Sequence, residues 1–181
     1  SAVKTVLLID PIALQGEDLL RQKAKIIHSP DSAPDTIRRL AKEADGIIIR
    51  SKLPDDIFEA APRLKAVAIH GTGTDLVPLE SANEHGVMVS NLPGINAESV
   101  AEYCVMAMLM LTRNILAITA AMRTQPCEVA RKGQATADEL EGATVGIIGV
   151  GEIGRRVAKI CRDGFGMRVL GNRRRLDRLP S

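Results

Sequence analysis

Short apolar runs alternate with amphipathic segments through the first hundred residues. Five runs predict buried strands, at residues 6–9, 24–27, 46–49, 64–69 and 87–89. Between them we expect a helix around Leu19 and Leu20, a second one with Asp35 as its N-cap, and a third over residues 55–61. Apolar strands that alternate with helices are typical of a parallel sheet covered on both faces. Right-handed crossovers would make this region a doubly wound α/β unit.

The pattern changes after residue 96. The segment from Ala97 to Met122 is rich in Ala, Met and Leu, and it predicts one long helix that is apolar over most of its circumference. We expect such a helix to be buried nearly all round, between domains, between subunits, or both. Residues 123–142 are polar, and we expect a shorter connecting helix there.

The last third of the chain carries a glycine motif between two apolar runs. The run at 144–148 leads directly into Gly149, Gly151 and Gly154, and a second run follows at 167–170. This order predicts strand, tight turn, helix and strand, the context in which G-x-G-x-x-G binds the pyrophosphate of a dinucleotide. The first glycine permits the turn, the second lets a phosphate approach the backbone, and the third lets the helix pack closely on the strand. The alternative is a glycine-rich turn with no ligand.

Composition narrows the choice of partners. Apolar residues make up 45% of the 181 residues, whereas aromatic residues make up 2%, and few aromatic side chains argue against base stacking with a single-stranded nucleic acid. The formal charge of +2 implies no nucleic-acid partner. The cysteines (Cys104, Cys127 and Cys161) form no metal pattern, so we expect no metal, and reduced thiols favour a cytoplasmic location. The apolar run at 105–111 is too short to span a membrane, and no signal peptide is expected before the first strand.

Three loops follow predicted strands and would lie at one edge of the sheet, where parallel sheets bind ligands. They offer cations, a hydroxyl, backbone N–H groups and side-chain amides, which together suit a small anion such as a carboxylate. The candidate substrate-binding residues are Arg50, Ser51, His70, Gly71, Thr72, Gly73 and Asn96. The alternatives are solvated charges for Arg50 and Lys52, turn geometry for the glycines, and an N-cap for Asn96. His70 is the candidate base, or else it orients the following loop.

The ordered motifs resemble the D-isomer-specific 2-hydroxyacid dehydrogenases. They are Arg50-Ser51, Gly73-Thr74-Asp75, Asn96-x-Glu98-Ser99-Val100-Ala101-Glu102 and Leu140-x-Gly142-x-Thr144-Val145-Gly146-Ile147-Ile148-Gly149-x-Gly151-x-Ile153-Gly154. The resemblance implies an α/β fold with a flavodoxin-like substrate domain at 1–96, an interdomain and dimerisation segment at 97–142, and the incomplete start of a Rossmann domain at 143–181. It also implies hydride transfer between a nicotinamide and a small anionic 2-hydroxy or 2-keto acid, in a homodimer formed through 97–122.

The chain departs from the family pattern at three places. The family's catalytic Arg, acidic residue and His would follow Ser181, so none is assigned within 1–181. Glu152 stands where the family often has Arg or His, and Arg155 and Arg156 could offset its charge. Asn172 replaces the acidic residue that would receive the ribose hydroxyls of NAD, and arginines follow it, which favours NADP with NAD as the alternative.

The candidate cofactor-binding residues follow from the motif and its resemblance. They are Gly149, Gly151, Glu152, Ile153, Gly154, Asn172, Arg173 and Arg174. An alternative function on the same scaffold is a non-catalytic module that senses NAD(P) or only dimerises. A solvated basic turn is the alternative for the arginines.

Overall fold

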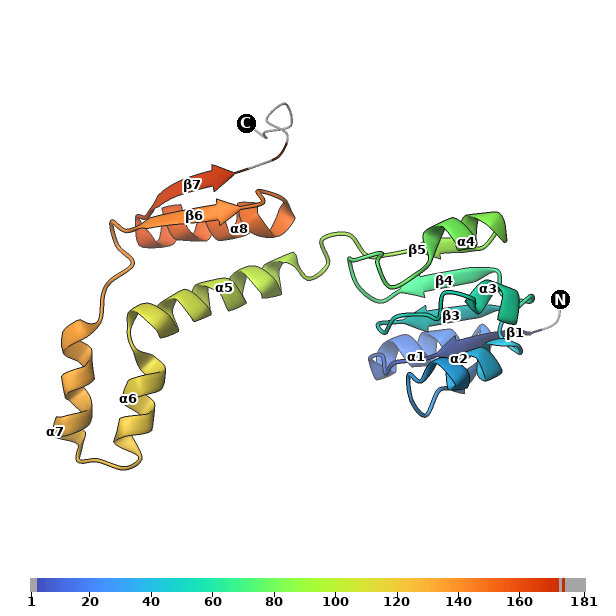
Figure 1. Cartoon of the computed structure of the whole chain (residues 1–181), viewed down its shortest axis with the longest axis horizontal. Helices are drawn as coiled ribbons and strands as arrows, with labels where there is room; N and C mark the ends of the chain where they lie inside the picture. The colour runs from blue at the N-terminus through green and yellow to red at the C-terminus, as the bar shows by residue number, and fades with distance from the viewer. Residues whose placement is uncertain (1–2, 173, 175–181) are drawn as a thin grey trace. The chain divides into compact units, whose positions relative to one another are not determined.

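The computed structural model describes residues 3–172 and 174 of the chain (Figure 1). The chain divides into two compact units, Ser1–Ile95 and Asn96–Ser181. The second unit takes in both the segment 97–142 and the segment 143–181. Each unit has its own apolar cluster, and each is described by itself below.

The first unit is built on a five-stranded sheet in which all pairs are parallel. Its strands are β1 (Lys4–Leu8), β2 (Ala24–His28), β3 (Gly46–Ile49), β4 (Ala66–Ile69) and β5 (Met88–Ser90). The order β2-β1-β3-β4-β5 means that the chain leaves β1 in one direction and returns to its other side at β3. Open parallel sheets bind ligands at such a reversal, outside the carboxyl ends of the strands. The predicted α/β class and parallel sheet are therefore confirmed.

Three helices bury one face of this sheet: α2 (Pro34–Ala41), α3 (Ile57–Ala60) and α4 (Leu79–Glu84). A fourth helix, α1 (Leu14–Arg21), has no buried residue and does not contribute to that core. Leu7, Ile47 and Val67 point to the same face of their strands and join side chains of α2, α3 and α4 in one core. On the opposite face Ile48 and Ala68 are only half-buried. We expected helices to cover both faces of the sheet. Within the described residues, one face is fully covered and the other only partly.

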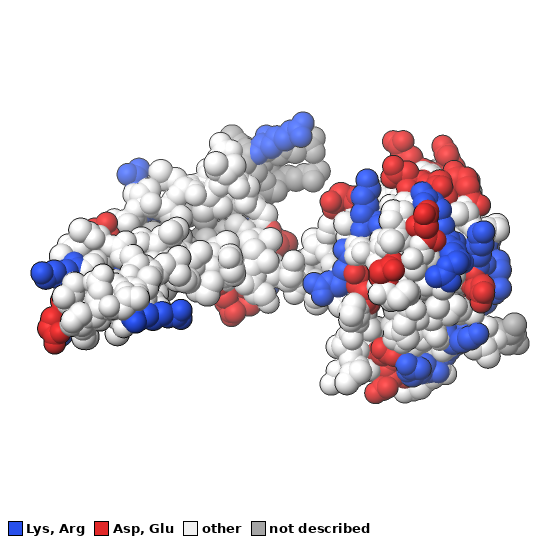
Figure 2. Space-filling model, turned by 60° about the horizontal axis from the view of Figure 1, so that its bottom comes forward, with Lys and Arg blue, Asp and Glu red and all other residues white. Residues whose placement is uncertain are grey.

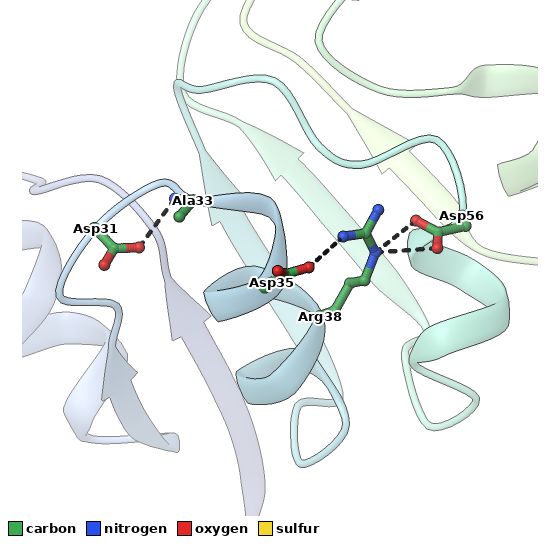
Figure 3. A network of polar contacts seen from close by, with 5 residues as sticks. All are labelled: Asp31, Ala33, Asp35, Arg38 and Asp56. Carbon is green, nitrogen blue, oxygen red and sulfur yellow. Dashed lines mark hydrogen bonds and ion pairs between the residues drawn. The ribbon is translucent and has the colours of Figure 1, made fainter.

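The start of α2 differs from the prediction. Asp35 is not the N-cap: the helix begins at Pro34, whose fixed φ and missing N–H suit the first helical position. Asp35 lies in the first turn and accepts a 2.8 Å bond from Arg38, which also contacts both carboxylate oxygens of Asp56 (Figure 3). The approach to the helix is held by Asp31, whose carboxylate accepts the Ala33 N–H at 2.9 Å.

The second unit contains the predicted strand–turn–helix–strand arrangement. Its elements are α5 (Ala97–Thr112), α6 (Ile115–Met122), α7 (Cys127–Ala130), the 3-10 helix η1 (Arg131–Thr136), β6 (Thr144–Ile148), α8 (Glu152–Lys159), its π-helical continuation η2 (Ile160–Gly164) and β7 (Arg168–Asn172). The strands β6 and β7 pair in parallel (Figure 1). Side chains of α5, α8 and both strands share the apolar cluster around Ala101 and Cys161.

The segment 97–122 is two helices, not one. The helices α5 and α6 meet at an angle of 62°. Between them Asn114 adopts a φ of 54°, a left-handed conformation that asparagine tolerates better than most residues. Its amide group donates to Thr136 Oγ1 at 3.0 Å, which holds the bend against η1. Among the described helices, none reaches the length and hydrophobicity of a membrane span by itself, and α5 with α6 does so only as this bent pair.

Much of the surface of 97–122 is exposed in the chain by itself. Only Ala97 and Ala101 are buried, whereas Tyr103, Leu111 and Leu116 keep 65%, 72% and 64% of their surface exposed. Residues of α8 and β6 cover one side of α5, and the described residues provide no equivalent cover for the other side. The expected burial between domains or subunits stays a prediction.

Candidate functional site

The loops after β1 and β3 are joined by Asp10, which sequence reasoning missed. Its carboxylate accepts the N–H groups of Arg50 and Ser51 at 2.6 and 2.8 Å and the Ser51 hydroxyl at 2.7 Å. This contact lies at the reversal of strand order between β1 and β3. Its position in the sequence could have identified it. Asp10 lies shortly after the first strand, just as Arg50 and His70 directly follow the third and fourth strands.

The loops after β3 and β4 lie side by side. The pairing of Ile49 with Ile69 places Ser51 and Gly71 at equivalent positions, two residues beyond the paired strands. The His70 N–H donates to the Ile49 carbonyl at 2.8 Å. Neighbouring strands are about 4.8 Å apart, so a small ligand can reach both loops. The structure therefore brings the predicted residues 50–51 and 70–73 to one edge of the sheet.

The loop after β5 fixes the loop after β4. The Asn91 amide donates to the Thr72 carbonyl at 2.7 Å, the Thr72 hydroxyl donates to the Leu92 carbonyl at 3.0 Å, and the Leu92 N–H donates to the Gly71 carbonyl at 2.8 Å. Two of these bonds use carbonyl groups of the 71–73 loop as acceptors, and in the third the Thr72 side chain is the donor. Among the described residues, no backbone or side-chain acceptor takes the N–H of Gly71 or Gly73. The surroundings of the two glycines differ, because a Cβ on Gly73 would lie 2.7 Å from the Asp75 carboxylate oxygen and one on Gly71 would meet nothing within 4 Å.

Asn96 is placed differently from the other candidates. It is the first residue of the second unit and occupies the N-cap position of α5, where its carbonyl accepts the Val100 N–H at 3.0 Å. The structure thus places Asn96 at the N-cap, which was the alternative to a role in substrate binding. A role in substrate binding stays a prediction for Asn96, as it does for Arg50, His70 and the loop glycines.

The Asp10 carboxylate is ionised at neutral pH. Burial raises its pKa, but the bonds from the Ser51 hydroxyl and from the Arg50 and Ser51 N–H groups, together with the Arg50 charge, outweigh burial and lower the pKa below its ordinary value of 3.8. An ionised carboxylate only accepts hydrogen bonds, so the Ser51 hydroxyl must be the donor in this contact. Ser51 is then left with acceptor capacity for a ligand.

This lowered pKa gives a pH-dependent contribution to stability. Folding favours the charged form of Asp10, so its contribution is complete above about pH 5 and is lost as the pH falls through the pKa of the folded state, below 3.8. At pH 7 we expect Asp10→Asn to lower the free energy of unfolding by about 1–3 kcal/mol. The gap between the two proteins should shrink at pH 3. Thermal unfolding at both pH values measures it, and an equal gap would contradict the assigned contacts.

The glycine turn of the second unit has the predicted geometry at two positions. Gly149 adopts a φ of 95°, and its N–H donates to the Asn172 carbonyl at 2.9 Å. A Cβ on Gly154 would lie 2.3 Å from the Gly149 carbonyl oxygen, so only glycine allows this approach of helix to turn. A Cβ on Gly151 would meet nothing within 4 Å, which leaves space for a phosphate beside the start of α8. The turn thus fits a dinucleotide pyrophosphate.

The charge of Glu152 is compensated within α8. Glu152 forms an ion pair with Arg155, one turn along the helix, while Arg156 pairs with Glu98 of α5. Arg155 therefore offsets the carboxylate as predicted, and Arg156 serves a different contact. Ile153, beside Glu152, is partly exposed at the turn.

The region expected to meet the ribose is described only in part. Asn172 is the last residue of β7, where its backbone carbonyl holds the turn, and its side chain is exposed. Arg174 is exposed as well. The prediction for Arg173 lies outside the described residues.

Comparison with known proteins identifies the family. The sequence profile of the D-isomer specific 2-hydroxyacid dehydrogenase, catalytic domain, matches residues 6–154. The chain belongs to this family. Hydroxypyruvate reductase of Thermotoga maritima is 36% identical over 165 residues, which cover 89% of this chain and 52% of the reductase. The chain thus spans about half the length of this relative.

Solved structures agree with this assignment. The NAD⁺-bound 3-phosphoglycerate dehydrogenase of Entamoeba histolytica is 25% identical, with a TM-score of 0.74 over 96% of this chain and 55% of that one. The TT0316 protein of Thermus thermophilus is 26% identical, with a TM-score of 0.83 over 97% of this chain and 58% of that one. The predicted resemblance and the Rossmann-like fold are therefore confirmed.

Proposed function

We propose that the full-length protein is a nicotinamide-dependent oxidoreductase that interconverts a small D-2-hydroxy acid and the corresponding 2-keto acid. The observation that carries this proposal is the glycine turn, where Gly154 permits close packing and Gly151 leaves open space at the start of α8. A nicotinamide supplies the acceptor or donor of the hydride when bound. Membership of the family supports an oxidoreductase acting on 2-hydroxy acids.

Each loop of this chain has a proposed task. The N–H groups of Gly71 and Gly73 bind the substrate carboxylate, and the Arg50 charge favours an anion nearby. The turn at Gly149–Gly154 and the first amides of α8 bind the pyrophosphate. The proton released at the substrate hydroxyl needs a base, and we expect the catalytic His, Arg and acidic residue beyond residue 181. His70 is proposed to take part in substrate binding.

We infer that NADP is the favoured cofactor. Asn172 at the end of β7 provides no carboxylate for the ribose hydroxyls, and the exposed Arg174 adds a cation nearby in the sequence. We expect kcat/KM to be about tenfold higher with NADPH than with NADH, because a charge-assisted contact to the 2′-phosphate is worth about 1.5–3 kcal/mol.

Steady-state kinetics of the full-length protein with a 2-keto acid and either NADPH or NADH tests both the proposed reaction and the proposed cofactor preference. Asn172→Asp is the matched variant, and it should move the preference toward NADH by repelling the 2′-phosphate. Equal values, or a preference for NADH in the unaltered protein, would contradict the choice of cofactor. Nucleotide binding without any turnover would favour the alternative of an NAD(P)-sensing module.

We further propose a homodimer formed through α5 and α6. These helices expose a large apolar surface, and such surfaces are typical of protein–protein interfaces. It is formed by Tyr103, Met106, Leu111, Ile115, Leu116 and Met122. We also propose a cytoplasmic location, which is supported by free thiols at all three cysteines.

We propose neither a nucleic-acid nor a membrane partner.

A further inference from the structure

Two of the three cysteines belong to one apolar cluster of the second unit. Cys161 is fully buried in this cluster, and Cys104, half-buried on α5, packs against it. The other described members of the cluster are apolar, whereas Lys, Arg, Asp and Glu side chains of this unit are seen at its surface in Figure 2. Both thiols are free, and the proposed reaction gives neither of them a task.

The packing of α5 on α8 places the two cysteines at the same level. The helices run in the same direction in Figure 1, and Glu98 of α5 forms an ion pair with Arg156 of α8. Cys104 lies six residues beyond Glu98, and Cys161 lies five residues beyond Arg156, so both are displaced from the ion pair by about 7.5–9 Å along their helices. Ala101, one turn before Cys104, is fully buried, and its small side chain lets the helices approach closely. This arrangement suits a disulfide, which needs Cα atoms within about 7 Å.

The surroundings of the two sulfur atoms differ. Cys104 lines a cavity of about 460 Å³ that also reaches Gly149 and Gly154, so a small oxidant can approach its sulfur. Cys161 has no exposed surface. Burial raises the pKa of the Cys161 thiol above its ordinary value of 9.0, and a charge on Cys104 raises it further. Cys104 is therefore the thiol that an oxidant meets first, and Cys161 is the thiol that reacts second.

We propose that hydrogen peroxide converts Cys104 and Cys161 into a reversible disulfide that ties α5 to α8. The Cys104 thiolate attacks a peroxide oxygen, which forms a sulfenic acid and releases hydroxide. The Cys161 thiol then loses its proton and attacks the Cys104 sulfur, so that the S–S bond forms and the sulfenic oxygen leaves as water. The two thiols give up two electrons and two protons, and the peroxide becomes two molecules of water. A dithiol restores both thiols by exchange.

Two observations favour a redox-sensitive pair over a permanent cross-link. Disulfides of cytosolic proteins are mostly transient and serve catalysis or redox sensing, which matches free thiols in the resting protein. Cys161 also lies in the π-helical turn η2, and such turns recur at functional sites. The bond would hold α5 against the helix whose first turn carries the glycine motif. This inference does not depend on the proposed reaction.

Peptide mapping of the full-length protein under non-reducing conditions tests the pairing. Trypsin places Cys104, Cys161 and Cys127 on three separate peptides, which are residues 66–113, 160–162 and 124–131. After treatment with hydrogen peroxide we expect the first two peptides to be linked, in at least about tenfold excess over any link to Cys127. The oxidised protein should unfold about 5 °C or more above the reduced protein, because the bond closes a loop of 57 residues. Dithiothreitol should reverse both effects.

Two alanine variants separate the proposed pair from general oxidation. Cys104→Ala should fold, because Cys104 is only half-buried, and it should abolish both the link and the rise in unfolding temperature. Cys127→Ala is the matched control, because Cys127 is exposed on α7, outside the cluster. It should change neither effect.

Three results would overturn the inference. The first is conversion of Cys104 to sulfinic acid with no link to Cys161. The second is linkage to Cys127 in equal yield, since only an unfolded chain would pair its thiols without selection. The third is a Cys104–Cys161 link that leaves the unfolding temperature unchanged, since the bond would then not hold the two helices together. In each case the proposed function stands, because it is measured separately by turnover of the reduced protein.

Discussion

Replacing Gly154 with alanine is expected to destabilise the second unit and to abolish tight nucleotide binding. The new methyl group would lie 2.3 Å from the Gly149 carbonyl oxygen and 3.1 Å from Ile147 Cγ2. Alanine gains about 1 kcal/mol over glycine from helix propensity. A clash with a backbone oxygen outweighs this gain, because neither atom can rotate away, and overpacking costs about 1–3 kcal/mol or more. The turn and α8 must therefore separate.

Gly151→Ala is the matched variant for this result. A Cβ there meets nothing within 4 Å, and the φ of −96° is open to any residue, so the cost in stability is limited to that of a poorer N-cap, about 0.5–1 kcal/mol. The methyl group would instead occupy the space proposed for the pyrophosphate. We expect Gly151→Ala to unfold close to the temperature of the unaltered protein but to bind NADPH at least about tenfold more weakly.

Thermal unfolding and fluorescence titration with NADPH of the full-length proteins measure both effects. A Gly151→Ala variant that binds NADPH normally would contradict a phosphate site at this turn. A Gly154→Ala variant with unchanged unfolding would show that the turn and helix do not pack as described. Gly146→Ala, on β6 with nothing within 4 Å of its added Cβ, should affect neither property.

Local patterns were sufficient to predict the strands and the glycine turn. Residues 46–49 are predicted as a strand and form β3 with the same bounds, because a short run of apolar, β-branched residues is typical of a strand. The role of Gly154 likewise follows from its spacing within a strand–turn–helix context, and the structure supplies the contact behind it. These features depend on neighbours in the sequence.

Features that depend on distant residues were not predicted. The bend at Asn114 is held by Thr136, 22 residues further on, and nothing in the apolar pattern of 97–122 signals it. Asp10 contacts Ser51, 41 residues further along the chain, only because β1 and β3 pair in the sheet. The N-cap of α2 is a local exception: it was misassigned although the residue that decides it, Pro34, directly precedes Asp35 and begins the helix.

The proposed dimer gives the second large expected effect. We expect the pair of substitutions Leu111→Arg and Leu116→Arg to convert the full-length protein from dimer to monomer at micromolar concentration. Both side chains are mostly exposed in the single chain, at 72% and 64%, so arginine there costs the folded chain little, within about 0.5 kcal/mol per site. In an apolar interface each unpaired charge costs several kcal/mol, so the dissociation constant should rise at least about 100-fold.

Sedimentation equilibrium measures the change, and Leu19→Arg provides the matched control. Leu19 is a helical leucine with a similar exposed fraction, 66%, but it lies on α1 in the first unit. Its substitution should leave the dimer intact, because the proposed interface involves only α5 and α6. If the double variant stays dimeric with unchanged affinity, the interface lies elsewhere. If the unaltered protein is monomeric, the exposed side of α5 needs cover from another source, since its apolar composition is unsuited to water.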